Sequence, residues 1–256
     1  MMNKYPFWVI KNDAKRLLRG KWNPLVLSLF VPFLLFMALQ VSCFSKIESM
    51  PPTPKREQYL FYAQITILVF SVVMQLLMAG IYENLKPTRK KASFFSVYYV
   101  SVKKIWKMLP TLLVVHLIPF RITYWISYGE AIRFYDYLMF SVIDYHVYLL
   151  ILQILIGIVG LFSMYFQYSL LLVPAITVEH PEYGGLRLMK ESFRVSKGNR
   201  IYLALLSLSF VGWILLGSLA YIGILWAILY LYAANYAYYR RLTITEEPIT
   251  VSEITE

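Results

Sequence analysis

The sequence predicts an all-α fold: a polytopic transmembrane helical bundle of about six spans, with three amphipathic interfacial helices on the cytoplasmic side. Hydrophobic residues make up 59% of the 256 residues, and the mean hydropathy is +0.57. Soluble domains hold roughly 45–50% apolar residues, so this composition is typical of membrane proteins. Long uncharged runs recur along the chain, and Lys and Arg gather in the segments between alternate runs.

The longest uncharged run lies between Arg200 and Arg240. It has room for two crossings of about 20 residues each, joined by a tight return. Gly217 and Gly223 flank the segment best suited to that return, because glycine adopts turn conformations without steric cost. We therefore expect a transmembrane helical hairpin at the C-terminal end of the sequence.

Six runs are expected to cross the membrane, at 22–44, 59–85, 109–127, 146–178, 200–217 and 222–239. Pro110 and Pro119 interrupt the third, so we expect that helix to be bent or broken. The fourth is longer than a perpendicular crossing requires, and its Gly157 and Gly160 predict a close helix–helix contact. Residues 1–242 would form a single membrane domain, followed by a disordered acidic tail at 243–256.

Basic, amphipathic segments precede each pair of spans. In the first, Phe7, Ile10 and Ala14 share one helical face, whereas Lys11 and Lys15 lie on the other side. This pattern predicts a helix on the inner membrane surface, although the same apolar stripe would also suit a packed core. The order of basic helix, turn and two spans recurs over about residues 4–85, 92–178 and 184–241, which suggests an internal repeat of three units.

The distribution of charge predicts the orientation. The formal net charge is +11. With both termini in the cytoplasm, 20 of the 25 Lys and Arg residues fall on the inner side and 4 on the outer side, as the positive-inside rule requires. The expected partners are the bilayer and its anionic inner-leaflet lipids, with a membrane protein or a second copy as further candidates, and not nucleic acid. Expected lipid contacts are Lys15, Arg16, Arg19, Lys90, Lys91, Lys103, Lys104, Arg187, Lys190 and Arg194.

Polar residues inside the predicted spans are the candidates for a functional cavity. His116 and Arg121 lie in the third span, and a charge inside the bilayer costs upward of about 2.5 kcal/mol unless it has a partner or water. A polar cavity lined by Gln75, His116, Arg121 and Gln153 could bind an anionic headgroup or pass a solute. The alternative remains open that Arg121 extends to the outer headgroups and that the others form interhelical hydrogen bonds.

The sequence favours a protein without catalytic activity. It contains no metalloprotease, phosphate-loop, serine-hydrolase or dinucleotide-binding motif. Cys43 is the single cysteine, so no internal disulfide can form, and we expect no metal ion and no cofactor. The leading hypothesis is transport or export of an amphipathic or peptide-like molecule, or immunity to one. The alternatives are a lipid-interacting scaffold or accessory subunit and a lipid-acting membrane enzyme.

Both ends and the middle of the chain carry a resemblance to a known family. The matching residues are Ala14-Lys15, Gly20-Lys21-Trp22, Gly80-Ile81-Tyr82, Leu188-Met189-Lys190, Lys197-Gly198, Leu206-Ser207, Ser209-Phe210, Gly212-Trp213, Ile222–Trp226, Tyr230 and Ala237–Arg240. They resemble the bacterial membrane-protein family known as domain of unknown function 975. Members commonly have proline before the tyrosine equivalent to Tyr230, where this chain has Leu229. The resemblance implies a bacterial cytoplasmic membrane and adds no mechanism.

Overall fold

The computed structural model describes residues 5–51, 54–120, 145–219 and 223–243, and within these ranges every regular element is a helix. This confirms the all-helical class. The helices are α1 Phe7–Leu18, α2 Trp22–Glu48, α3 Pro54–Leu85, α4 Phe94–Leu112, the π-helix η1 Leu113–Leu117, α7 Tyr145–Leu170, α8 Val173–Glu179, α9 Gly185–Ser196, α10 Arg200–Leu208, α11 Val211–Ser218 and α12 Gly223–Thr243.

Four helical segments of the described chain are long and apolar enough to cross a membrane: Trp22–Glu48, Gln58–Leu85, Gln153–Glu179 and Arg200–Ser218. They correspond to the first, second, fourth and fifth predicted spans. Large apolar side chains such as Leu35 and Leu161 project outward from them, 62% and 71% exposed. Soluble monomers rarely expose such continuous apolar surface, whereas lipid would cover it.

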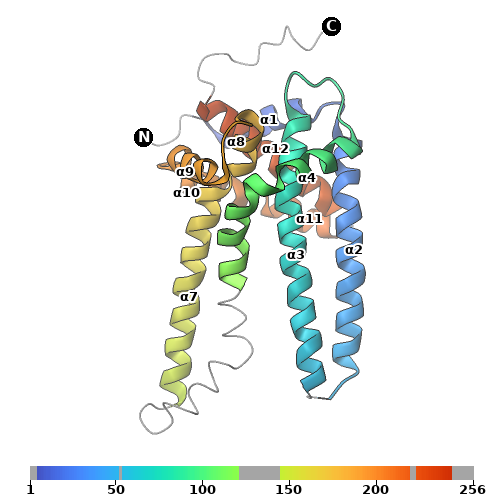
Figure 1. Cartoon of the computed structure of the whole chain (residues 1–256), viewed down its shortest axis with the longest axis vertical. Coiled ribbons are helices and arrows are strands. Elements are labelled where there is room, and N and C mark those ends of the chain that lie inside the picture. Colours follow the sequence, from blue (N-terminus) through green and yellow to red (C-terminus); the bar gives the residue numbers. More distant parts are fainter. Residues whose placement is uncertain (1–4, 52–53, 121–144, 220–222, 244–256) are drawn as a thin grey trace.

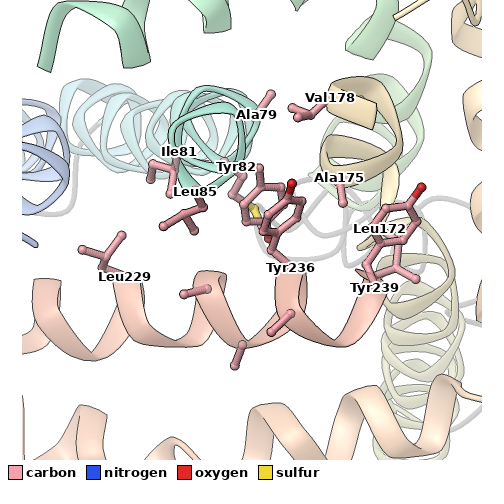
Figure 2. Packing of buried hydrophobic residues seen from close by; sticks show 14 of the residues in the cluster. Ala79, Ile81, Tyr82, Leu85, Leu172, Ala175, Val178, Leu229, Tyr236 and Tyr239 are labelled. Atoms are coloured by element: carbon pink, nitrogen blue, oxygen red, sulfur yellow. The ribbon is translucent and has the colours of Figure 1, made fainter. Parts of the chain in front are cut away.

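The third and sixth predicted spans differ from expectation. The part of the third that is described, 109–120, is not broken: it continues α4, with Pro110 inside it, through the π-helix η1. The run is bent, as Figure 1 shows; residues 121–127 lie outside the described ranges. The sixth, α12, has 21 residues but is not among the four candidate segments; it contains five tyrosines, Asn235 and two arginines. Figure 2 shows α12 running across α3, which is seen nearly end-on.

The fourth predicted span is divided into α7 and α8 by a turn at Leu171–Leu172. Pro174 explains the division, because proline lacks the N–H that would donate to the carbonyl of residue 170. Among the glycines, Gly157 and Gly160 have open space within 4 Å of where a Cβ would lie, whereas a Cβ on Gly80 would overlap the Val97 carbonyl oxygen. A close helix contact therefore joins α3 to α4 at Gly80, whereas no described residue lies close to Gly157 or Gly160.

The helices are arranged along one long axis, as Figure 1 shows. The lower parts of α2, α3 and α7 extend to one end, while α1, α8, α9 and α12 gather at the other. Helix α1 packs its apolar stripe on α12, so that Ile10, Ala14 and Leu18 are fully buried. Arg241 of α12 donates to the Asp13 carboxylate of α1. The apolar face of α1 is thus covered by protein.

The core lies at this end, where α3, α8 and α12 meet (Figure 2). The rings of Tyr82 and Tyr236 stack with centroids 5.1 Å apart, and the Tyr236 hydroxyl donates to the Glu179 carboxylate. Aliphatic side chains, including Leu85 and Leu229, surround this pair with less than 2% exposure. Stacked aromatic rings bury large areas, so this contact joins the carboxyl-terminal halves of three helices.

The three expected units share a pattern of side-chain exposure. Equivalent positions are found by counting from the first residue of α1, α4 and α9. Equivalent residues are Trp8, Phe95 and Leu186, which are strongly exposed, and three sets that are at most 5% exposed: Ile10, Val97 and Leu188; Ala14, Ser101 and Ser192; Leu25, Leu112 and Leu203. The residue before each helix is extended, with ψ of 150°, 133° and 162°. The structure therefore supports the three-unit repeat that the sequence suggested.

The first and third units also share a turn. Arg19 and Lys197 have φ/ψ of −57°/124° and −59°/124°, and the glycines that follow, Gly20 and Gly198, have φ of 72° and 81°. In the middle unit the equivalent residue is Lys107. A lysine adopts positive φ only at a cost, and here α4 continues through that position as uninterrupted helix.

We predict that Gly20→Ala or Gly198→Ala lowers the free energy of unfolding by about 1–2 kcal/mol, because each glycine has positive φ. A Cβ added at either glycine would meet nothing within 4 Å, so the effect reports the backbone alone. Thermal unfolding in detergent measures it. Gly157→Ala is the control: its Cβ also meets no atoms, but the residue lies within a helix, where alanine is favoured. Equal effects at all three positions would contradict this explanation.

Candidate functional site: a basic pocket between α3, α4 and α8

A cavity of about 430 Å³ opens where the end of α3, the middle of α4 and the end of α8 meet. We call it the basic pocket, because five cationic side chains and one carboxylate line it. Its lining residues are Glu83, Lys86, Arg89, Tyr99, Val100, Lys103, Lys104, Lys107, Val178 and Pro181. An excess of cations in a partly enclosed site attracts anions.

Glu83 is the one carboxylate of the lining and is shared among three cations. Its oxygens lie 3.5 Å from Lys86 Nζ, 3.6 Å from Arg89 Nη2 and 3.4 Å from Lys104 Nζ. Glu83 therefore pairs with cations of the basic run that follows α3 and with one cation of α4. A single negative charge cannot neutralise three cations, and Lys103 and Lys107 add to the excess.

The carboxyl end of α8 fixes the direction of the lysines. Lys86 Nζ donates to the Val178 carbonyl at 3.0 Å and Lys104 Nζ to the Thr177 carbonyl at 3.1 Å. Lys107 Nζ donates to the Pro181 carbonyl just beyond the helix. The last carbonyls of a helix lack intrahelical partners and carry partial negative charge, so ammonium groups stabilise them. Each ammonium retains donors that these carbonyls do not use.

Lys104 is the most deeply placed of these cations, with its side chain 14% exposed. Burial lowers its pKa below the usual 10.5, the positive charges of Lys86 and Lys107 act in the same direction, and Glu83 opposes them. Burial and the nearby Arg89 likewise lower the pKa of Lys21. In both lysines burial is the largest factor that disfavours the charged form.

The pocket arises where the middle unit departs from the repeat. Lys104 occupies the position of Leu17 in the first unit and Val195 in the third, and Lys107 occupies the position of the turn glycines. In the other units these positions pack or turn, whereas here they supply two cations. Departures from a local pattern of this kind concentrate at functional sites.

The ten predicted lipid contacts are spread over this end of the molecule. Lys103 and Lys104 line the basic pocket. Arg187 lies over the Tyr183 ring, 4.0 Å from its centroid, and Arg194 pairs with Glu191. The others are on the exposed surface: Lys15, Arg16, Arg19, Lys90, Lys91 and Lys190. The sequence analysis did not predict a role for Lys86, Arg89 or Lys107. The sequence signal that points to Lys107 is that it stands where the other two units have a turn glycine.

A second polar cluster lies between α3 and η1. His116 Nε2 is 2.5 Å from Gln75 Oε1, and its Nδ1 is 3.1 Å from Ser71 Oγ. An amide oxygen only accepts, so Nε2 carries the proton and donates to Gln75. The π-helical turn contains His116, and such turns are frequent at functional sites.

A cavity of about 380 Å³ adjoins this cluster, with a lining of Gln64, Ile67, Leu68, Ser71, Val115, His116, Pro119 and Phe120. Of the four predicted cavity residues, the structure thus brings Gln75 and His116 together. Gln153 is exposed on α7, and Arg121 lies outside the described residues. Among the described residues, no group of three or more His, Cys, Asp or Glu side chains could hold a metal ion.

A comparison with family models matches residues 2–246 to a family described as protein of unknown function, DUF975. The chain belongs to the DUF975 family. No curated protein and no solved structure matched the chain. The family match covers all three units, so the basic pocket lies wholly within the region that defines this DUF975 protein.

We predict that the Lys104 amine titrates below pH 10.5, because burial lowers its pKa. NMR of ¹³C-dimethylated lysines, assigned with Lys104→Arg, measures the midpoint. In Glu83→Gln the midpoint should fall further, because the charge that raises this pKa is removed. Between the lowered midpoint of the folded protein and pH 10.5, the unfolded chain keeps the Lys104 proton that the folded protein has lost. The free energy of unfolding should therefore increase with pH over that interval. A midpoint at or above 10.5 would contradict the burial of this charge.

Proposed function

We propose that this DUF975 protein binds a phosphate-bearing anion in the basic pocket, at the cytoplasmic face of a bacterial membrane, without catalysing a reaction. The observation that carries the proposal is the set of five cations around one carboxylate. Lys103 has no hydrogen bond or ion pair in the described structure, so at least one cation lacks an internal counter-charge. Lys and Arg donors at such a site favour phosphate and carboxylate oxygens.

The membrane layout that we propose has six crossings, both termini in the cytoplasm and the three amphipathic helices at the cytoplasmic surface. Its support is the position of the cations: α1, α9 and the residues between α3 and α4 hold 10 of the 25 Lys and Arg residues, and these segments lie at one end of the long axis. The contact between Asp13 and Arg241 places the first and last described helices at that same end. A bacterial inner leaflet is anionic and lies on the side that basic segments prefer.

Glu83 lines the pocket and Glu179 lies beside the core, and each carboxylate already has a hydrogen-bond or ion-pair partner. Three cations surround Glu83, and Glu179 accepts the hydroxyl of Tyr236. A carboxylate that acts as a general acid or base must be free to reach a substrate. These contacts favour binding over catalysis as the role of the pocket.

A second proposal is the transport or export of an amphipathic or peptide-like molecule, or immunity to one. The cavity beside His116 favours it, because a polar group within a span suits a solute pathway. Its lining and that of the basic pocket have no residue in common among the described residues. We therefore place binding at the basic pocket first.

We predict that Lys103→Met, Lys104→Met and Lys107→Met together weaken binding of short-chain phosphatidic acid about a hundredfold, since each well-placed cation contributes about 1 kcal/mol. The ligand is titrated against the purified protein in neutral-lipid nanodiscs, and the rise in unfolding temperature gives the affinity. The matched control is Lys15→Met, Arg16→Met and Lys190→Met, which removes three exposed cations outside the pocket.

The control variant should bind within about threefold of the wild type, because solvent-exposed charges are screened at physiological salt. Equal losses in both triple variants would show that general surface charge attracts the ligand, and would refute a pocket. Circular dichroism of each variant establishes that the fold is retained.

We also predict which single cysteines can be labelled from outside the cell when they are introduced into the cysteine-free Cys43→Ala protein. Cysteine at Lys90 or Lys197 should be protected from a membrane-impermeant maleimide in intact cells, and cysteine at Lys46 should react. These positions lie on opposite sides of the proposed layout, and all three residues are exposed. Labelling at 90 and 197 with protection at 46 would reverse the proposed orientation.

A further inference from the structure

We propose that the anion in the basic pocket is the headgroup of an anionic membrane lipid, whose acyl chains lie along an exposed apolar stripe of α4. The inference rests on the proposed function and names the source of the phosphate. The stripe consists of Phe95, Tyr99, Val102 and Trp106, which are 79%, 68%, 70% and 80% exposed. Their spacing of four, three and four residues places them on one helical face.

The opposite face of α4 is fixed against the protein. Val97 and Met108 are fully buried, and the Tyr98 hydroxyl donates to the Ser28 carbonyl at 2.7 Å. The missing side chain of Gly80 lets the α4 backbone lie directly against α3. Helix α4 therefore cannot rotate to bury its stripe, and the four large side chains remain available to an apolar partner.

Two of the four stripe positions are aromatic in the middle unit alone. The residues equivalent to Tyr99 are Asn12 and Lys190, and those equivalent to Trp106 are Arg19 and Lys197. The repeat thus has polar or charged residues where α4 has two aromatic rings. The same helix departs from the repeat at Lys104 and Lys107, so the apolar stripe and the extra cations occur together.

The two features adjoin each other. Tyr99 belongs to the stripe and also lines the basic pocket, and Lys103 and Lys107 each lie one residue from a stripe residue along α4. A ligand that fills both must be anionic at one end and apolar beyond it. An anionic membrane lipid has this chemistry, whereas free phosphate would leave the stripe exposed and a neutral lipid would leave the cations without a counter-charge.

The deciding experiment compares a lipid with free phosphate. Val102→Ser/Trp106→Ser removes two stripe residues that do not line the pocket. It should weaken binding of dioleoyl phosphatidic acid about a hundredfold, since each of the two buried apolar side chains contributes about tenfold or more. Binding of inorganic phosphate should not change. Lipid retention is measured by native mass spectrometry from mixed micelles, and phosphate binding by ³¹P NMR on the same samples.

Trp8→Ser/Leu186→Ser is the matched control, because both residues are strongly exposed on the amphipathic helices of the other units. It should leave both ligands unaffected. If Val102→Ser/Trp106→Ser retains the lipid as the wild type does, or weakens phosphate equally, the lipid assignment is wrong. If the triple lysine variant of the pocket keeps its affinity for both ligands, the proposed function itself fails.

Discussion

Lysine side chains cap the carboxyl ends of α3, α8 and α10, and the cation-rich end of the molecule depends on these contacts. Lys21 Nζ donates to the carbonyls of Asn84 and Lys86 at the end of α3, at 2.9 and 3.2 Å. Lys11 Nζ donates to the Ser209 carbonyl after α10 at 3.2 Å, as Lys86 and Lys104 do at α8. A buried helix end with unpaired carbonyls would be costly, and a cation also complements the partial negative charge there.

The long spans could be predicted from the sequence because composition and length decide them. Helices α2 and α3 and the long part of α7 fall where the uncharged runs do. The direction of α12 could not be predicted in this way. Its tyrosines are compatible with a membrane boundary and equally with the packed core that Tyr236 forms with Tyr82. Tertiary contacts with α1 and α3, which no local pattern reveals, determine where it lies.

The candidate site could be predicted only in part, for a related reason. Sequence reasoning identified Lys103 and Lys104 as cations of a basic helix, and Gln75 and His116 as polar residues within spans. It treated charge as a property of each segment, whereas the pocket forms where three segments converge. Lys107 belongs to it because the end of α8 lies within reach, and the turn before Pro174 that brings this end there is a tertiary feature.

The repeat explains why the middle unit is the one that carries the site. In the first and third units a glycine with positive φ separates the amphipathic helix from its span. In the middle unit Lys107 replaces that glycine, and α4 continues as one helix past it. Because the helix is not interrupted there, residues on both sides of that position keep helical register, with Lys104 and Lys107 near α8 and Trp106 facing outward. Loss of one turn therefore yields both the charged and the apolar parts of the proposed lipid site, while the other two units retain the contacts that stabilise the fold.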